Sequence, residues 1–147
     1  MASMYAESPF LARYSKMSIE DEAKFLESVE KAETNLMLGG FLGHDLVALC
    51  YFAPVGSAVK VAHRCQIGIS VTKTQQGKGI ASLLMEGLLS SAKQAGFSQM
   101  ELEVVANNYP AIKLYEKFCF QRIGIIPRGF RYKEGYHKDL LLMVKEL

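Results

Sequence analysis

The chain has 147 residues, the usual size of one domain, and half of them are hydrophobic, so it can bury a core without disulfides or a structural metal. Its formal net charge of +2 is too small for a protein whose main partner is nucleic acid. The three cysteines, Cys50, Cys65 and Cys119, form no CxxC pair, which favours a reducing compartment over a disulfide framework.

Targeting and membrane signals lead to the expectation of a cytoplasmic protein. The first ten residues, MASMYAESPF, lack the basic region and the apolar stretch of a signal peptide. The longest apolar stretch, residues 46–55, is shorter than the ~18 residues of a membrane span and contains Pro54. The sequence also contains no linker or repeat, so we expect one domain over residues 1–147. We expect no membrane, nucleic acid or metal as a partner.

In the N-terminal half, the pattern predicts one helix and then three strands. Ser18 and the acids after it suit the start of a helix. Gly68 indicates a bulge or a close backbone approach in the third strand. The predicted elements are a helix at about 19–32 and strands at 35–43, 46–53 (after a tight turn at 43–45) and 61–71.

In the C-terminal half, a long helix follows Gly79. Apolar or small residues recur there at helical spacing, and Gly96 suits the position after the helix end. Asn108 is the expected N-cap of a shorter helix, with Pro110 in its permitted first turn. The other predicted elements are a strand at 100–105, the short helix at 108–118, and closing strands at 120–127 and 137–147 around a turn at 128–136.

Residues 75–92, QQGKGIASLLMEGLLSSA, place Gly77 and Gly79 directly before the long helix. A Walker phosphate loop is excluded, because Thr72 stands where its first glycine belongs and Gly79 where its hydroxyl belongs. A dinucleotide fingerprint fits poorly, because Ser82 replaces its third glycine and TKTQQ separates the strand from the glycines. The remaining pattern, QGKGIA at 76–81, has the form Gln/Arg-x-x-Gly-x-Gly/Ala on a strand, loop and long-helix frame.

This stretch resembles the pyrophosphate loop of the GCN5-related N-acetyltransferase (GNAT) superfamily. About thirty residues downstream, NNYPAIKLYEKFCF resembles the superfamily's Asn-x-x-Ala-hydrophobic-x-Leu-Tyr-x-x-x-Gly-Phe segment, through Asn108, Ala111, Ile112, Leu114, Tyr115 and Phe120. The similarity runs from about Leu36 to the C-terminus. It implies an α/β (α+β) fold, with a mixed, mostly antiparallel twisted sheet flanked by helices. It also implies an N-acetyltransferase that moves the acetyl group of acetyl-CoA to a primary amine of a small molecule or peptide by direct attack.

The physical chemistry of the loop suits a diphosphate. A helix N-terminus presents unpaired N–H groups and a partial positive charge, and glycines remove the Cβ atoms that would hold phosphates away. A helix cap that binds nothing is the alternative. By the resemblance, the pantetheine arm lies along residues 69–71, and Gly68 fits a separation of this strand from the one at 100–105. Asn108 caps its helix, contacts the cofactor, or does both. The implied cofactor-binding residues are Ile69, Ser70, Val71, Gln76, Gly77, Lys78, Gly79, Ile80, Ala81 and Asn108.

Tyr115 is the expected catalytic acid. When a neutral amine attacks the thioester, the departing thiolate benefits from a proton donor, and the superfamily's tyrosine is commonly assigned this role. The alternative is a packed core aromatic, since Tyr115 shares a helical face with Ala111, Leu114 and Phe118.

The general base is less evident, because the strand before the glycine loop has no carboxylate. Glu103 on the next strand is the expected substitute. His63, His137 and Asp139 are other candidates, each of which also suits a surface or structural role. The backbone N–H of Val71 is the expected donor to the oxyanion.

Two departures from the superfamily pattern stand out. Cys119 replaces the glycine before Phe120, which predicts an altered turn there, with the cysteine as a small buried residue. The superfamily's usual first strand and first helix are expected to be missing, so that either the chain is shortened or a partner subunit, as in a homodimer, covers the gap.

Two other functions remain open at this point. A non-catalytic acyl-CoA-binding protein would need the glycine loop but no base. An RNA-binding module is suggested by RGFRYKEGYHK at 128–138, whose first three residues match the start of an RNP1 pattern, although Arg131 and Lys133 break it.

Overall fold

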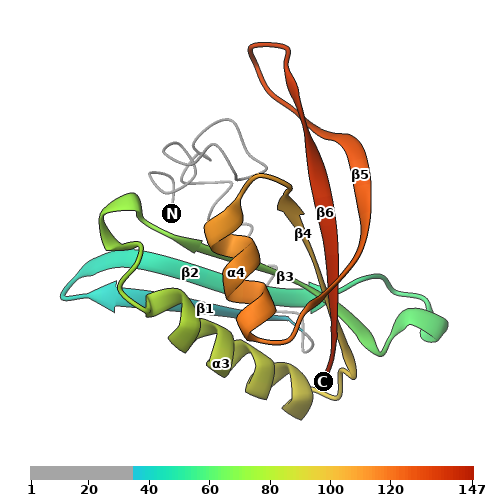
Figure 1. Cartoon of the computed structure of the whole chain (residues 1–147). Coiled ribbons are helices and arrows are strands. Elements are labelled where there is room, and N and C mark those ends of the chain that lie inside the picture. The colour runs from blue at the N-terminus through green and yellow to red at the C-terminus, as the bar shows by residue number, and fades with distance from the viewer. Residues whose placement is uncertain (1–34) are drawn as a thin grey trace.

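The computed structural model describes residues 35–147, which form one six-stranded sheet with two α-helices on one of its faces (Figure 1). The strand order is β1-β2-β3-β4-β6-β5, and every neighbouring pair except β3–β4 is antiparallel. The expected mixed, mostly antiparallel sheet is confirmed. In chain order the elements are β1 (Leu36–Leu42), β2 (Asp45–Pro54), β3 (Arg64–Val71), α3 (Ile80–Gln94), β4 (Gln99–Val105), α4 (Tyr109–Lys117), β5 (Gln121–Arg131) and β6 (His137–Glu146).

The helix expected at about 19–32 lies outside the described residues, and so does the part of the chain that bears on the expected lack of the superfamily's first strand and first helix. In the part of the chain that is described, no helix is both long enough and apolar enough to cross a membrane.

β3 and β4 are neighbours over only three residue pairs. Residues 64–66 pair in parallel with residues 99–101, whereas β3 stays paired with β2 as far as Val71 and β4 stays paired with β6 as far as Val105. The sheet therefore divides beyond Gln66 into a β1–β2–β3 half and a β4–β6–β5 half that turn away from each other (Figure 1). The separation expected beside the third strand is present.

The two helices share one core against the same face of the sheet. Met85, Leu88 and Ala92 of α3 are fully buried and lie three to four residues apart, as one face of a helix requires. Ile112 and Tyr115 of α4 join them, and burying each large side chain contributes about 1.5–3 kcal/mol. The strand residues of this core are Cys50, Phe52, Cys65, Ile67, Met100, Leu102, Val104, Leu141 and Met143.

The third strand begins at Arg64 rather than at the expected residue 61. Val59–Val61 form a short 3-10 helix, and the Ala62 N–H donates to the Val59 carbonyl at 3.2 Å. These local bonds take the backbone groups that a strand would have paired. Of the two alternatives expected at Gly68, a bulge is absent, because the register between β2 and β3 is continuous, whereas a close approach is present, because the Tyr51 ring lies against the glycine.

The turn expected at 128–136 is too long, because β5 continues to Arg131. The β5–β6 register shifts between Ile126 and Phe130, where Arg128 adopts a φ of 55°. The Asp139 carboxylate on β6 accepts the Arg128 backbone N–H at 2.8 Å. This bond holds the irregular segment in place, so that the strand resumes after it.

Cys119 is exposed, so the expectation of a buried residue is wrong. Its φ of 63° lies in the left-handed region that favours glycine. The turn is nevertheless made, because the N–H of Cys119 donates to the Glu116 carbonyl at 2.9 Å and that of Phe120 donates to the Tyr115 carbonyl at 3.0 Å. The cysteine therefore occupies the turn with a backbone geometry suited to the superfamily's glycine.

Candidate functional site

The glycine loop between β3 and α3 is open to solvent. Gly77 and Gly79 adopt φ values of 77° and 84°, which side chains with a Cβ rarely tolerate. A Cβ added to either glycine would meet no other atom within 4 Å. The glycines therefore serve the backbone conformation and leave free space above the loop, rather than making room for packing inside the protein.

The loop presents a set of unpaired amides at the start of α3. The first hydrogen bonds of the helix run from Ser82 and Leu83 to the Gly79 carbonyl, at 3.0 and 3.2 Å. Within residues 35–147, the N–H groups of residues 77–81 have no acceptor. Together with the positive end of the helix dipole, these amides form a site suited to a phosphate or diphosphate.

Side chains hold this loop to its neighbours. The Gln76 amide donates to the Val71 carbonyl at 3.1 Å and so ties the loop to the end of β3. Lys78 donates to the Gln75 side chain at 2.8 Å, which keeps its charge beside the loop. These contacts give Gln76 and Lys78 positions that agree with the expected anion site.

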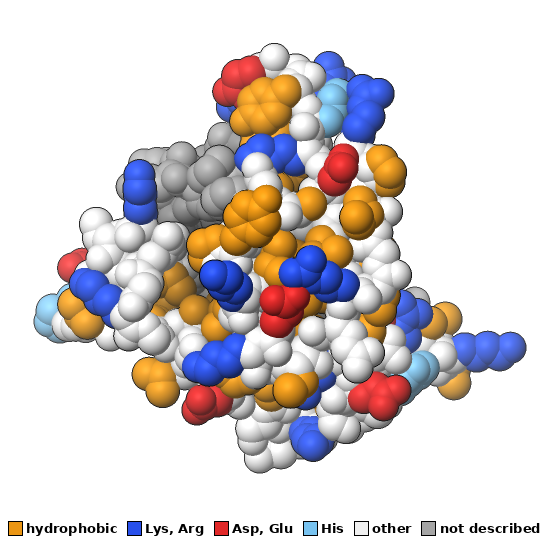
Figure 2. Space-filling model, viewed as in Figure 1, with side chains coloured by type: hydrophobic (Ala, Val, Ile, Leu, Met, Phe, Trp, Pro, Cys, Tyr) orange, Lys and Arg blue, Asp and Glu red, His pale blue; other side chains and the backbone are white. Residues whose placement is uncertain are grey.

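Lys117 brings a second cation to the loop, and the sequence did not indicate it. Its ammonium group donates to the Ser82 hydroxyl at 3.3 Å, which joins the last turn of α4 to the first turn of α3. Figure 2 shows basic side chains over α4 on this face, where Lys113 and Lys117 are both exposed. The 35 positions between Lys117 and Ser82 explain why no local pattern revealed the contact.

Among the strands of residues 35–147, the separation of β3 from β4 leaves one edge of β3 without a partner. Residues 69–71 lie beyond the last β3–β4 pair, while β2 occupies their other edge. Backbone groups at such an edge can pair with an extended ligand as they would with another strand. At the end of the strand, the Thr72 hydroxyl is buried and has no partner among the described residues, a feature that no local sequence pattern predicts.

Tyr115 lies in the core face of α4 with 6% of its surface exposed. Its ring meets the Phe120 ring edge-on, with centroids 5.8 Å apart. Burial raises the pKa of Tyr115 well above its usual value, and the nearby Tyr51 raises it further. The phenol therefore keeps its proton through the neutral range, and within residues 35–147 its hydroxyl is engaged in no hydrogen bond.

Asn108 caps α4, since its side chain accepts the Ala111 backbone N–H at 3.4 Å. Pro110 occupies the first turn of this helix, where its missing N–H costs nothing. The cap fixes the start of the helix that carries Tyr115.

The candidate bases lie in different places. Glu103 is exposed on β4, next to the separation from β3. His63 lies before β3, at the end opposite the glycine loop and roughly 25 Å of strand away. Asp139 holds the Arg128 backbone, and His137 lies 3.4 Å from the Arg128 guanidinium. Of these candidates, Glu103 is the one that the strand separation leaves next to the open edge.

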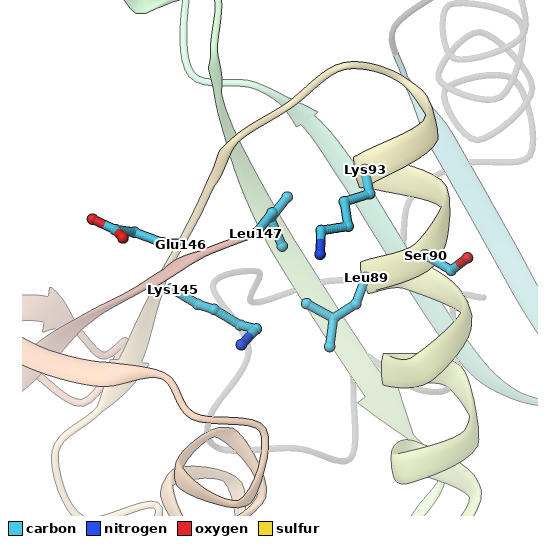
Figure 3. Close-up of a pocket in the computed structure, with 6 residues that line it drawn as sticks. All are labelled: Leu89, Ser90, Lys93, Lys145, Glu146 and Leu147. Atoms are coloured by element: carbon cyan, nitrogen blue, oxygen red, sulfur yellow. The ribbon is translucent and has the colours of Figure 1, made fainter.

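A cavity of about 240 Å³ lies elsewhere in the molecule. Figure 3 shows Lys93 and Lys145 directed toward the space between the last turns of α3 and the end of β6. This is the far end of α3 from the glycine loop, about 22 Å along the helix. The cavity is therefore separate from the expected phosphate site. Among residues 35–147, no three His, Cys, Asp or Glu side chains gather to form a metal site.

Comparison with known sequences identifies relatives that are named as acetyltransferases. The family model described as "Acetyltransferase (GNAT) family" matches residues 2–120. An N-alpha-acetyltransferase of Saccharolobus solfataricus is 37% identical over 82 residues, which cover 55% of this chain and 47% of that protein. The L-amino acid N-acetyltransferase AaaT of Escherichia coli is 28% identical over 85 residues, covering 57% and 52%. The chain spans about half the length of the curated relatives it matches.

Solved structures share the fold at low sequence identity. The ribosomal-protein-alanine N-acetyltransferase of Brucella melitensis matches with a TM-score of 0.90 and 18% identity, over 99% of this chain and 89% of that one. The putative acetyltransferase YncA of Salmonella typhimurium, solved with its cofactor acetyl-CoA, matches with a TM-score of 0.89 and 17% identity, over 99% and 86%. These matches agree with the mixed sheet described above.

Proposed function

The chain belongs to the acetyltransferase (GNAT) family, and we propose that it transfers the acetyl group of acetyl-CoA to a primary amine of a small molecule or peptide. The observation that carries this proposal is the open loop at the start of α3, where two glycines with positive φ belong to a row of amides that have no acceptor among the described residues. A diphosphate is the chemical group that such a loop suits best.

The residues of the chain fit acetyl-CoA along the line of the strand separation. The amides of residues 77–81 would hold the diphosphate, with Lys78 and Lys117 as cations beside it. The unpaired edge of β3 at Ile69, Ser70 and Val71 would pair with the amides of the pantetheine arm. This course leads from the glycine loop toward the part of the sheet where Tyr115 lies.

Three groups would then serve the transfer. Glu103 would take the proton of the attacking amine, directly or through water, as the bond between nitrogen and the acetyl carbon forms. The Val71 N–H would donate to the carbonyl oxygen while it carries negative charge. Tyr115 would donate its proton to the sulfur as the carbon–sulfur bond breaks, and burial keeps that proton in place at neutral pH.

The alternative RNA-binding function is less well supported by the β5–β6 hairpin. The rings of Tyr132 and Tyr136 stack on each other there, 4.5 Å apart and nearly parallel. Faces that are engaged in this way are not free to stack on bases. The expected homodimer stays a prediction, which sedimentation or light scattering of the purified protein would test.

The proposed function is tested with acetyl-CoA and a panel of amines. The panel contains a polyamine, free amino acids, an amine antibiotic and short peptides with free N-termini, and release of the CoA thiol is followed for each. We expect the parent protein to acetylate at least one class of amine, and we expect the Gly79→Val variant to lose this activity. A folded protein that binds CoA and acetylates no member of the panel would be the non-catalytic acyl-CoA-binding protein instead.

A further inference from the structure

Tyr51 on β2 lies across Gly68 on β3. The two residues face each other in the β2–β3 register. A Cβ built on Gly68 would lie 2.7 Å from Cζ and 2.9 Å from Oη of the Tyr51 ring, closer than real Cβ contacts come. The absence of a side chain at Gly68 is therefore what lets the ring lie over β3, with its hydroxyl above the strand.

This position is where β3 and β4 part. Their pairing ends at Gln66, two residues before Gly68, so the Tyr51 hydroxyl lies over the strand at the start of its open edge. Cys50 and Phe52, the neighbours of Tyr51, are part of the core beneath α3 and α4. Because side chains alternate along a strand, Tyr51 lies on the opposite face of the sheet.

Tyr115 lies on the helix side of the sheet. It belongs to the core face of α4, and its pKa is raised chiefly by burial and further by Tyr51. The two phenols therefore lie on opposite faces of the sheet, within electrostatic range of each other. Tyr115 is almost completely buried, whereas Tyr51 is only half-buried.

The geometry points to Tyr51 as a contact for the acceptor amine. Among the described residues, α3 and α4 cover the face that holds Tyr115, which leaves the face that holds Tyr51 for the approach of an acceptor. Its phenol oxygen can accept a hydrogen bond from the incoming amine N–H and so direct the nitrogen lone pair toward the thioester carbon. In this assignment Tyr115 donates its proton to the departing sulfur, and Tyr51 accepts a hydrogen bond from the arriving amine. This assignment rests on the proposed function.

The test separates the acceptor side from the cofactor side. Tyr51→Phe keeps the ring over Gly68 and removes only the hydroxyl. With acetyl-CoA and the best amine of the panel, we expect the KM for the amine to rise about tenfold, which is one lost hydrogen bond. The affinity for CoA and the KM for acetyl-CoA should stay at the values of the parent.

Gly68→Ala provides a second route to the same effect, because its Cβ would push the Tyr51 ring aside. We expect a similar rise in the KM for the amine, and the double variant should be no worse than the more affected single one. Gly124→Ala is the matched control, since a Cβ there meets Leu142 at an ordinary 3.7 Å. If Gly68→Ala fails to fold, Tyr51→Phe still decides the question.

Three outcomes contradict the assignment in distinguishable ways. An active Tyr51→Phe variant with an unchanged KM for the amine overturns the role of Tyr51 and leaves the proposed function intact. Loss of CoA affinity in that variant places Tyr51 on the cofactor side. A parent protein that binds CoA and acetylates no amine overturns the proposed function, and the acceptor contact with it.

Discussion

Arg64 and Glu101 join β3 to β4 at the last point before the two strands separate. The guanidinium of Arg64 contacts both carboxylate oxygens of Glu101, with 2.8 Å between Nη2 and Oε2. The pair spans the whole three-residue stretch over which the strands are neighbours. Glu101 is thereby committed to structure, and Glu103, two residues further along, is the carboxylate on this face of β4 that remains for chemistry.

Glu103→Gln should therefore slow acetyl transfer without unfolding the protein. Loss of a general base typically costs about 100-fold to 10,000-fold in rate. Glu101→Gln is the matched control, because it weakens the pair with Arg64 and should lower the melting temperature while leaving the rate of transfer near that of the parent. Equal rates for Glu103→Gln and the parent would remove Glu103 from the mechanism.

CoA should stabilise the folded protein through the glycine loop. A ligand at one hundred times its dissociation constant adds about 2.7 kcal/mol to the free energy of unfolding, or roughly 5–10 °C in melting temperature for a chain of this size. A thermal-shift titration with CoA measures this rise. Pantetheine, which lacks the diphosphate, is the control and should give a much smaller shift. A folded protein with no response to millimolar CoA would falsify the assignment of the loop.

Gly79→Val should abolish most CoA binding. Its side chain would project into the open space above the loop and block the approach of a phosphate to the amides. Valine at a φ of 84° also strains the backbone by about 1–2 kcal/mol. Gly96→Val is the matched control, since Gly96 has a φ of 89° and equally open surroundings at the other end of α3. Both variants should lose similar stability, and only Gly79→Val should lose affinity for CoA in a calorimetric titration.

The sequence predicted the elements better than the contacts between them. The glycine loop and the Tyr115 helix are local patterns, and each of them lies where the spacing placed it. The third strand is expected from residue 61 but begins at Arg64, because a 3-10 helix competes with the strand for the same backbone groups at 59–61. Gly68 predicts either a bulge or a close approach, and only the packing against the Tyr51 ring distinguishes the two.

The contacts that the sequence did not predict join residues far apart in the chain. The contact between Lys117 and Ser82 joins two helices, and the pair of Arg64 with Glu101 spans 37 positions. A periodic pattern in the sequence cannot predict such a pair, because the two residues come together only after the sheet has formed. The sequence could therefore name Glu103 as a possible base but could not show that Arg64 occupies the neighbouring Glu101.

The three thiols should differ sharply in reactivity. Burial raises the pKa of Cys50 from the usual 9.0 to about 11, and that of Cys65 to about 12, whereas Cys119 is exposed. Because the thiolate is the reactive form, one thiol per chain should react quickly with a disulfide reagent at mildly alkaline pH. The other two should react only after unfolding, and fast reaction of all three would contradict the buried positions of Cys50 and Cys65.

The same burial gives stability a pH dependence on the alkaline side. Below pH 9.0 the thiols are protonated in both the folded and the unfolded chain, so their contribution is constant. Above it the unfolded chain releases protons that the folded chain keeps, so stability falls as the pH rises toward about 11. Denaturant melts of the parent and of Cys50→Ala across this range would measure the difference in slope.

Tyr115→Phe separates structure from chemistry at the centre of the site. The ring keeps its edge-on contact with Phe120, so the melting temperature and the affinity for CoA should stay near those of the parent. The proton for the departing sulfur is lost, and turnover should fall by about 100-fold to 10,000-fold, or roughly 3–5 kcal/mol of barrier. Since burial holds the pKa of Tyr115 high, the loss should be similar across the neutral range. Tyr109→Phe removes a hydroxyl from an exposed position of the same helix and should have no effect. Full turnover in Tyr115→Phe would reduce Tyr115 to a core aromatic, and the thiolate would then leave unaided or with another donor.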